Sequence, residues 1–161
     1  MNYEIEKLPE KDIEQCLKHI KKHAKKNGIE YPPKRVQTFR EVLQKFTHDD
    51  KSGLALVVYD NNKIIASAMI DIFYSFDGKN TKEAEIMGIY VSDKFQGQGI
   101  AKAMMHQLFD FARNNQVARI YLYARTPSAK GLYKKLGFTQ LLPDEYNGRV
   151  TMFLDCCKID I

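Results

Sequence analysis

Apolar residues recur at intervals of three and four along residues 10–26, which is the spacing that places side chains on one face of a helix. The pair Asn27-Gly28 follows, and glycine is common just beyond a helix end. After Pro32-Pro33 the same periodicity returns. The apolar positions are Ile13, Leu17, Ile20 and Ala24 in the first segment, and Val36, Phe39, Val42, Leu43 and Phe46 in the second. The pattern therefore predicts two amphipathic helices.

The next residues follow the pattern of strands. Residues 54–59 are mostly apolar, residues 60–63 (Asp-Asn-Asn-Lys) are typical of a tight hairpin turn, and residues 64–72 alternate. The alternation places Ile64, Ala66, Ala68, Ile70 and Ile72 on one face of the strand. A short first strand is also expected within residues 2–6, and a second turn within 75–81.

The second half alternates strands and helices. A strand over 83–91, a helix from Ile100 to Arg113 and a strand over 119–123 predict a parallel pair with a right-handed crossover. Thr126-Pro127 is typical of a helix start, and this last helix should end at Gly137. Strands over 138–141 and 150–154 complete the sheet. We expect one α/β domain over residues 1–161, with a mixed, mostly antiparallel sheet and helices on both faces.

Composition narrows the classes of partner. The net charge is +5, and the lysines between Lys18 and Lys26 repeat at helical spacing, but acidic residues flank them and no aromatic residues interleave. A solvated helix face is favoured over a nucleic-acid site, so no nucleic-acid partner is expected. No apolar run approaches the 18 residues of a membrane span, and residues 1–6 lack the layout of a signal peptide. A cytoplasmic protein without a membrane partner is expected.

The cysteines show no metal-ligand spacing. Cys16, Cys156 and Cys157 are interpreted as reduced structural thiols. His19 and His23 stand one helical turn apart, which a metal could use, but no cysteine or carboxylate partner is evident. We interpret both histidines as part of a solvated helix face, and no metal is expected.

The glycine-rich turn over residues 96–101 (Gln-Gly-Gln-Gly-Ile-Ala) lies between a predicted strand and a predicted helix. Outward N–H groups and the helix dipole make such a turn an anion site, and glycine lets the backbone approach a phosphate closely. A dinucleotide fingerprint does not fit, because Lys102 stands where glycine or alanine is needed. A P-loop does not fit either, because Gly-Lys-Ser/Thr is absent at the required spacing.

Two motifs resemble those of the GNAT family of N-acetyltransferases. The segment from Val91 to Ala101 resembles the family's Gln/Arg-x-x-Gly-x-Gly/Ala signature, and residues 133–138 (Tyr-Lys-Lys-Leu-Gly-Phe) resemble its late Tyr-x-x-x-Gly-Phe motif. The motifs occur in the family's order, and the resemblance covers roughly residues 54–154.

The resemblance implies that acetyl-CoA is the cosubstrate. Its pyrophosphate would dock on the N–H groups of the glycine turn, which comprises Gln96, Gly97, Gln98, Gly99, Ile100 and Ala101. Backbone groups of Ile89 and Val91 would bind the pantetheine arm and steady the oxyanion. Thr126 stands where family members often carry an asparagine that contacts the cofactor, so a shorter hydroxyl contact, or only a helix cap, is implied there.

The resemblance also implies two proton-transfer residues. Tyr133 matches the tyrosine that the family places near the CoA sulfur, and is assigned as the acid that protonates the leaving thiolate. Glu85, four residues before Ile89, is the candidate base that keeps the attacking amine neutral. A water chain could replace that base, and Asp71 is a weaker alternative.

The leading hypothesis is an N-acetyltransferase acting on a primary amine. The alternative is a non-catalytic acyl-CoA-binding sensor or partner-binding module on the same fold. The resemblance implies that the binding site for the acceptor amine is shaped by the first two helices, the loop after Ile72 and residues 143–149, and polyamine, amino-acid, antibiotic and protein amines all remain open. The apolar strand over 150–154 is expected at a sheet edge, where it would pair with a second copy in a homodimer, with a monomer as the alternative.

Overall fold

The computed structural model of the 161-residue chain describes residues 3–141 and 150–156. Their backbone divides into two compact units, one made of Met1–Ile70 and Gly88–Leu108, the other of Asp71–Met87 and Phe109–Ile161. No helix in the described ranges is long and apolar enough to cross a membrane. The single domain expected from the sequence stays a prediction.

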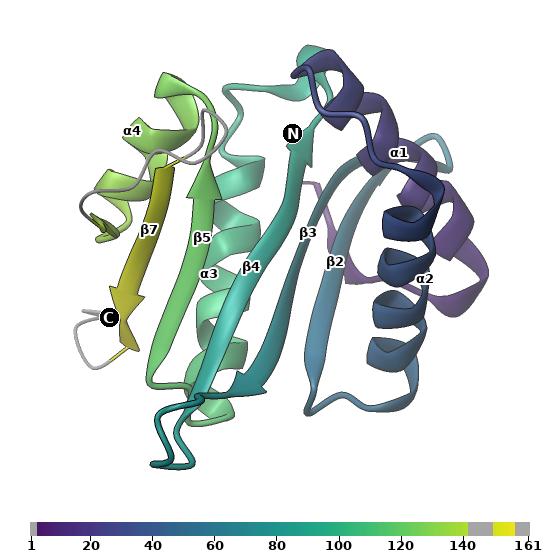
Figure 1. The fold of residues 1–161 in the computed structure, drawn as a ribbon. Helices are drawn as coiled ribbons and strands as arrows, with labels where there is room; N and C mark the ends of the chain where they lie inside the picture. The colour runs from purple at the N-terminus through teal and green to yellow at the C-terminus, as the bar shows by residue number, and fades with distance from the viewer. Residues whose placement is uncertain (1–2, 142–149, 157–161) are drawn as a thin grey trace. The chain divides into compact units, whose positions relative to one another are not determined.

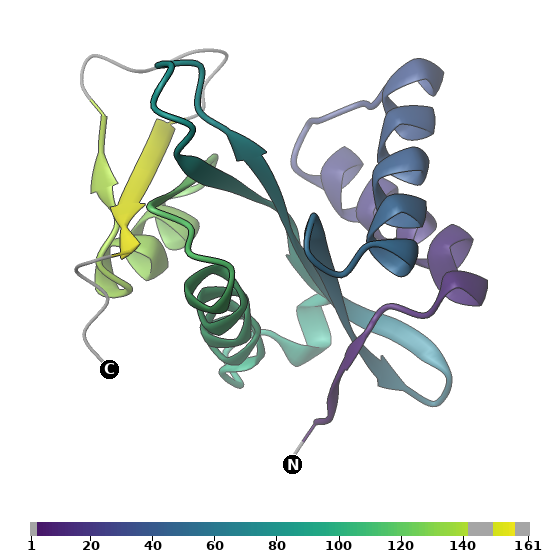
Figure 2. The same cartoon turned by 90° about the horizontal axis from the view of Figure 1, so that it is seen from below.

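The first unit opens with two helices packed on each other. Strand β1 (Ile5–Lys7) pairs antiparallel with β2 (Gly53–Asp60), and the 3-10 turn η1 (Glu10–Asp12) leads into α1 (Ile13–Lys26). Helix α2 (Pro33–His48) lies beside α1 and contacts β2 (Figures 1 and 2). The predicted apolar face of α1 is buried, which confirms this amphipathic helix.

The hairpin between β2 and β3 (Lys63–Tyr74) forms where the sequence predicts it. Asn61 and Asn62 turn the chain with φ angles of +48° and +61°, the left-handed conformation that asparagine tolerates well. Strand β3 is buried on both faces along much of its length, because Ile65, Ser67 and Met69 are as buried as Ile64, Ala66 and Ala68. A strand that is covered on both faces has buried residues at every position instead of every second one. Because Ser67 is small and polar, the sequence does not reveal that its face of the strand is also covered.

The parallel pair that the sequence predicts is present. Strand β4 (Lys82–Val91) pairs in parallel with β5 (Arg119–Ala124), and α3 (Ile100–Asn114) makes the crossover. Helix α4 (Pro127–Lys135) contacts β5 (Figure 1), and Thr126 caps it by accepting a 3.1 Å hydrogen bond from the N–H of Ala129. The sheet ends with β6 (Thr139–Gln140) and β7 (Val150–Asp155).

The strands form one seven-stranded, mostly antiparallel sheet in the order β1-β2-β3-β4-β5-β7-β6. The expectation that residues 150–154 lie at an edge is wrong, because β7 pairs with β5 on one side and β6 on the other. The two residues of β6 pair with the outer side of β7, and the order of elements along the chain does not reveal this pairing. The homodimer inferred from a free edge at β7 loses that support.

Candidate functional site

The glycine turn connects β4 to α3 by way of the 3-10 turn η2 (Asp93–Phe95). Gly97 and Gly99 have φ angles of +75° and +80°, which side chains with a Cβ rarely adopt. A Cβ built on either glycine would meet no heavy atom within 4 Å. The backbone conformation therefore requires glycine at both positions, and the space in front of the turn is open to a bulky ligand.

Several N–H groups of this turn are available to a ligand. The first hydrogen bond of α3 runs from the N–H of Ala103 to the carbonyl of Gly99, at 3.0 Å. Within residues 3–141 and 150–156, no protein acceptor is found for the N–H groups of residues 97–102. These groups and the dipole of a 15-residue helix favour an anion at the start of α3.

Gln96 uses its own polar groups within the protein. Its N–H donates to the carbonyl of Asp93 at 3.3 Å, and its side-chain Nε2 donates to the carbonyl of Val91 at 2.9 Å. Of the turn predicted from the sequence, residues 97–101 thus offer their N–H groups outward, while Gln96 ties the turn to the end of β4.

Strand β4 is irregular at Gly88, just before Ile89. Gly88 has a φ angle of +65°, and a Cβ there would come within 2.8 Å of the terminal methyl carbon of Met69. The carbonyl of Gly88 accepts a 2.8 Å hydrogen bond from the hydroxyl of the buried Ser67. A positive φ inside a strand is typical of a β-bulge, a device that re-aims the residues following it.

The pairing of β4 with β5 covers only the start of both strands. Its register runs from Glu83–Arg119 to Glu85–Tyr121, although β5 continues to Ala124. The backbone groups of Ile89 and Val91 lie beyond this register, so within the described residues β5 does not pair with them. A strand backbone without a neighbour on one side can bind an extended ligand as an added strand would.

Tyr133 and Glu85 both belong to the second unit. Tyr133 lies on α4 with a side chain that is 6% exposed, and its ring centroid is 6.0 Å from that of Phe138. Burial raises the pKa of Tyr133 to about 12, so its hydroxyl stays protonated at neutral pH. Glu85 is half-buried on β4 and stands opposite Tyr121 in the parallel register. Thr126, the remaining predicted cofactor contact, is exposed and uses its hydroxyl to cap α4.

The interpretation of His19 and His23 as a solvated face is wrong. Each is 7% exposed, and their ring centroids are 4.5 Å apart on α1. Burial, with His23 as the second cause, lowers the pKa of His19 to about 4, and burial also lowers the pKa of His23. The available signal was spacing, since both histidines fall three residues after buried positions of the same helix, Cys16 and Ile20.

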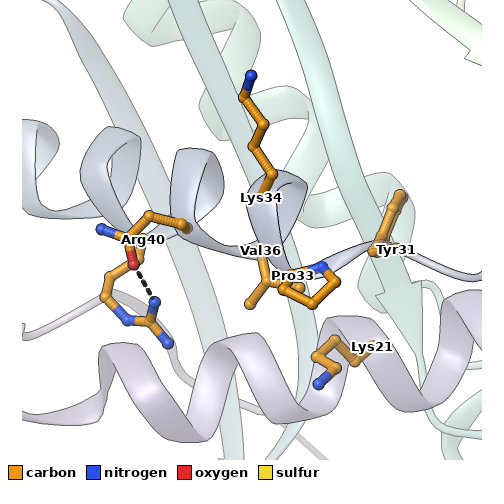
Figure 3. A pocket seen from close by; sticks show the side chains of 7 residues that line it. Lys21, Tyr31, Pro33, Lys34, Val36 and Arg40 are labelled. Carbon is orange, nitrogen blue, oxygen red and sulfur yellow. Dashed lines mark hydrogen bonds between the residues drawn. The ribbon is translucent and has the colours of Figure 1, made fainter.

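A cavity of about 540 Å³ lies between α1 and α2 rather than at the glycine turn (Figure 3). Its lining includes Lys21, Val36 and Arg40, and Arg40 donates to the side chains of Gln37 and Glu14. Lys21 stands two residues from His19 and from His23, which is about 200° around the helix. The cavity therefore opens on the face of α1 opposite the two buried histidines.

The chain matches the model of the Acetyltransferase (GNAT) family over residues 17–138. It is 37% identical, over 59 residues, to the uncharacterized N-acetyltransferase ycf52 of Pyropia yezoensis, and that match covers 37% of this chain and 33% of the relative. A second ycf52 protein, from Porphyra purpurea, matches to the same extent. The chain thus spans about a third of the length of these curated relatives.

Solved structures share the fold at low sequence identity. A protein of Clostridium acetobutylicum described as a predicted acetyltransferase, solved with acetyl-CoA, has a TM-score of 0.75 and 22% identity, covering 90% of this chain and 95% of its own. The PaiA N-acetyltransferase of Thermoplasma acidophilum, in complex with coenzyme A, has a TM-score of 0.68 and 17% identity, covering 96% and 99%. The mixed α/β fold predicted from the sequence is confirmed.

Proposed function

Because the chain belongs to the acetyltransferase (GNAT) family, we propose that it transfers the acetyl group of acetyl-CoA to a primary amine. The observation that carries this proposal is the glycine turn, with two left-handed glycines facing open space at the start of α3. The turn has the right donors for an anion, because the N–H groups of residues 97–101 have no acceptor among the described residues. A pyrophosphate fits that donor set.

The chain would hold the cosubstrate at two places within the first unit. N–H groups of Gly97 to Ala101 would bind the pyrophosphate, while Gln96 keeps the turn attached to Val91. Backbone groups of Ile89 and Val91 would pair with the amides of the pantetheine arm. One of these N–H groups would also stabilise the oxyanion that forms when the amine attacks the thioester carbon.

Tyr133 is proposed as the acid toward the leaving sulfur. Its pKa of about 12 lies well above the roughly 8.5 of a simple thiol, so complete proton transfer to the thiolate is uphill by about 5 kcal/mol. The hydroxyl therefore acts mainly as a hydrogen-bond donor that stabilises the negative charge as the carbon–sulfur bond breaks. Because the hydroxyl stays protonated at neutral pH, this donor is present throughout the working range.

Glu85 is proposed as the base that accepts the proton lost by the amine. A carboxylate on a strand, half-buried, is fixed enough to face one proton donor and exposed enough to exchange its proton with water. A water chain is the alternative route, and Asp71, which is also half-buried, is the weaker candidate on β3. The net reaction joins the amine nitrogen to the acetyl carbon and breaks the carbon–sulfur bond. The amine proton goes to Glu85, and the leaving thiolate, hydrogen-bonded to Tyr133, becomes the thiol by taking up a proton that solvent supplies in the end.

The first experiment measures whether CoA raises the melting temperature of the chain. A ligand that binds only the folded state stabilises it, so CoA should raise the melting temperature of the wild-type protein. Gly99→Glu should abolish that shift, because it places a bulky anion in the turn. Gly78→Glu is the matched control, since Gly78 has the same left-handed backbone (φ +75°) and open surroundings, but lies in the β3–β4 hairpin.

Comparing the two variants separates the loss of the CoA site from the general destabilisation that a side chain causes at a left-handed glycine position. We expect Gly78→Glu to melt earlier than wild type and still to be stabilised by CoA. A normal CoA shift in Gly99→Glu would remove the glycine turn from the site. CoA binding without acetyl transfer to any amine in a panel would favour the non-catalytic acyl-CoA-binding module instead.

The remaining expectations stay predictions. They are the homodimer, the cytoplasmic location, the absence of nucleic-acid partners and the identity of the amine. Of the segments expected to shape the acceptor site, residues 143–149 lie outside the described residues. Light scattering on the purified chain tests the homodimer directly, since a mass of one chain at micromolar concentration would exclude it.

A further inference from the structure

Helix α1 contacts the segment that leads from β4 into the glycine turn. His19 Nε2 lies 3.4 Å from the carbonyl oxygen of Tyr90, and His23 Nε2 lies 3.3 Å from the hydroxyl of Ser92. One turn further along, Lys26 forms an ion pair with Asp93. Three residues on one side of α1 thus contact three nearly consecutive residues of the segment, all of them within the first unit.

These three contacts differ in strength. The side chains of Lys26 and Asp93 are 58% and 57% exposed, and exposed ion pairs contribute little. The 3.4 Å contact of His19 is long for a hydrogen bond. His23 is buried, and its ring stacks on that of Tyr90 with centroids 6.0 Å apart and an interplanar angle of 22°. The contact of His23 with Ser92 is therefore the better-fixed one.

Ser92 is the point where α1, β3 and the turn are joined. Its N–H donates to the carbonyl of Ile65 on β3 at 2.8 Å, and its carbonyl accepts from the N–H of Phe95 at 2.8 Å. Its hydroxyl holds the contact with His23 in either imidazole tautomer, because a hydroxyl can both donate and accept.

The turn beyond Ser92 has little packing of its own. Residues 96–99 are exposed, and Phe95 is half-buried against the edge of Tyr3, with ring centroids 5.8 Å apart. The next fully buried side chain is Ile100, at the start of α3. Apart from the hydrogen bonds that Gln96 and Gln98 donate to the carbonyls of Val91 and Lys94, the path of the turn is set by its two ends, and Ser92 holds the upstream end.

We propose that His23 is a positioning residue for the CoA site, acting through its hydrogen bond to Ser92. This inference rests on the proposed function, since it assumes that CoA binds at the glycine turn. Several N–H groups bind one pyrophosphate well only when all of them reach hydrogen-bond distance together. Fixing Ser92 before the ligand arrives lowers the ordering cost of binding. Burial lowers the pKa of His23, which favours the neutral imidazole, so His23 acts on the ligand through geometry rather than charge.

The test is a double-mutant cycle on CoA affinity. The variants are His23→Phe, which keeps an aromatic ring against Tyr90 but loses the hydrogen bond, Ser92→Ala, and the two combined. The dissociation constant of CoA is measured by calorimetry, well below the melting temperature of each variant. Each single change should raise this constant about two- to tenfold, the scale of one hydrogen bond. The double variant should have a CoA dissociation constant no higher than that of whichever single variant binds CoA less tightly, because both changes remove the same hydrogen bond.

Two further variants serve as controls. Ser92→Thr keeps the hydroxyl and should restore affinity to within about twofold of wild type. His48→Phe makes the same change at an exposed histidine at the end of α2 and should leave CoA binding unchanged. If His23→Phe does not fold, the comparison of Ser92→Ala with Ser92→Thr decides the question, because both are small changes.

Each other outcome overturns the inference. Lower melting temperatures with unchanged CoA affinity would make the contact merely structural. Losses that multiply in the double variant would show that His23 and Ser92 act independently. A wild-type chain that does not bind CoA would overturn the proposed function, and this inference with it. Wild-type binding with unaffected variants would overturn the inference alone.

Discussion

Lowering the pH from 7 to 5 should destabilise the folded protein through His19, which is buried on α1. Burial and the nearby His23 lower the pKa of His19 from 6.5 to about 4. The folded protein therefore binds this proton more weakly than the unfolded chain. Between these two values the unfolded state takes up more protons, so the free energy of unfolding falls as the pH falls.

The size of this loss follows from the two pKa values. At pH 5 the imidazole is almost fully protonated in the unfolded chain but only about one-tenth protonated in the folded protein. The difference corresponds to about 2 kcal/mol lost between pH 7 and pH 5, and to about 3 kcal/mol by pH 4. Since a domain is stable by about 5–15 kcal/mol, the loss should be large enough to measure.

The assay is urea unfolding of wild type and His19→Gln at both pH values. Glutamine keeps a polar side chain but does not titrate, so the variant should lose about 2 kcal/mol less than wild type between pH 7 and pH 5. His48→Gln is the control, because His48 is exposed at the end of α2 and its removal should leave the wild-type loss in place. Equal losses in wild type and His19→Gln would refute the argument from burial.

Three further changes test the proposed chemistry and the core. Tyr133→Phe should lower kcat about 10²-fold while the CoA dissociation constant stays within about twofold, and an unchanged kcat would make Tyr133 a packing residue. Glu85→Gln should lower kcat/KM for the amine about 10²-fold at a fixed pH, and an unchanged kcat/KM would favour the water chain. Cys16 is buried on α1, where burial raises the pKa of its thiol to about 12, so iodoacetamide should modify it in urea but hardly in the folded protein. Mass spectrometry of the labelled chain checks this, and rapid labelling of the native protein would contradict it.

The sequence by itself determined the features that depend on neighbouring residues. The apolar spacing of α1, the asparagine turn after β2 and the cap at Thr126 appear where the pattern predicts them. The two glycines that open α3 also adopt the left-handed backbone that such a turn requires. These features are local because a few φ and ψ angles and one or two side chains fix each of them.

Only the tertiary structure decided which polar residues are buried and which strands are neighbours. The spacing of His19 and His23 allows a buried face but does not require one, and they are buried because β4 and Ser92 lie against that face of α1. The second covered face of β3 could not be read for the same reason, since the layer that covers it comes from elsewhere in the chain. Strand β7 lies inside the sheet because two residues of β6 pair with it, and such long-range pairing leaves no mark on the local pattern of β7.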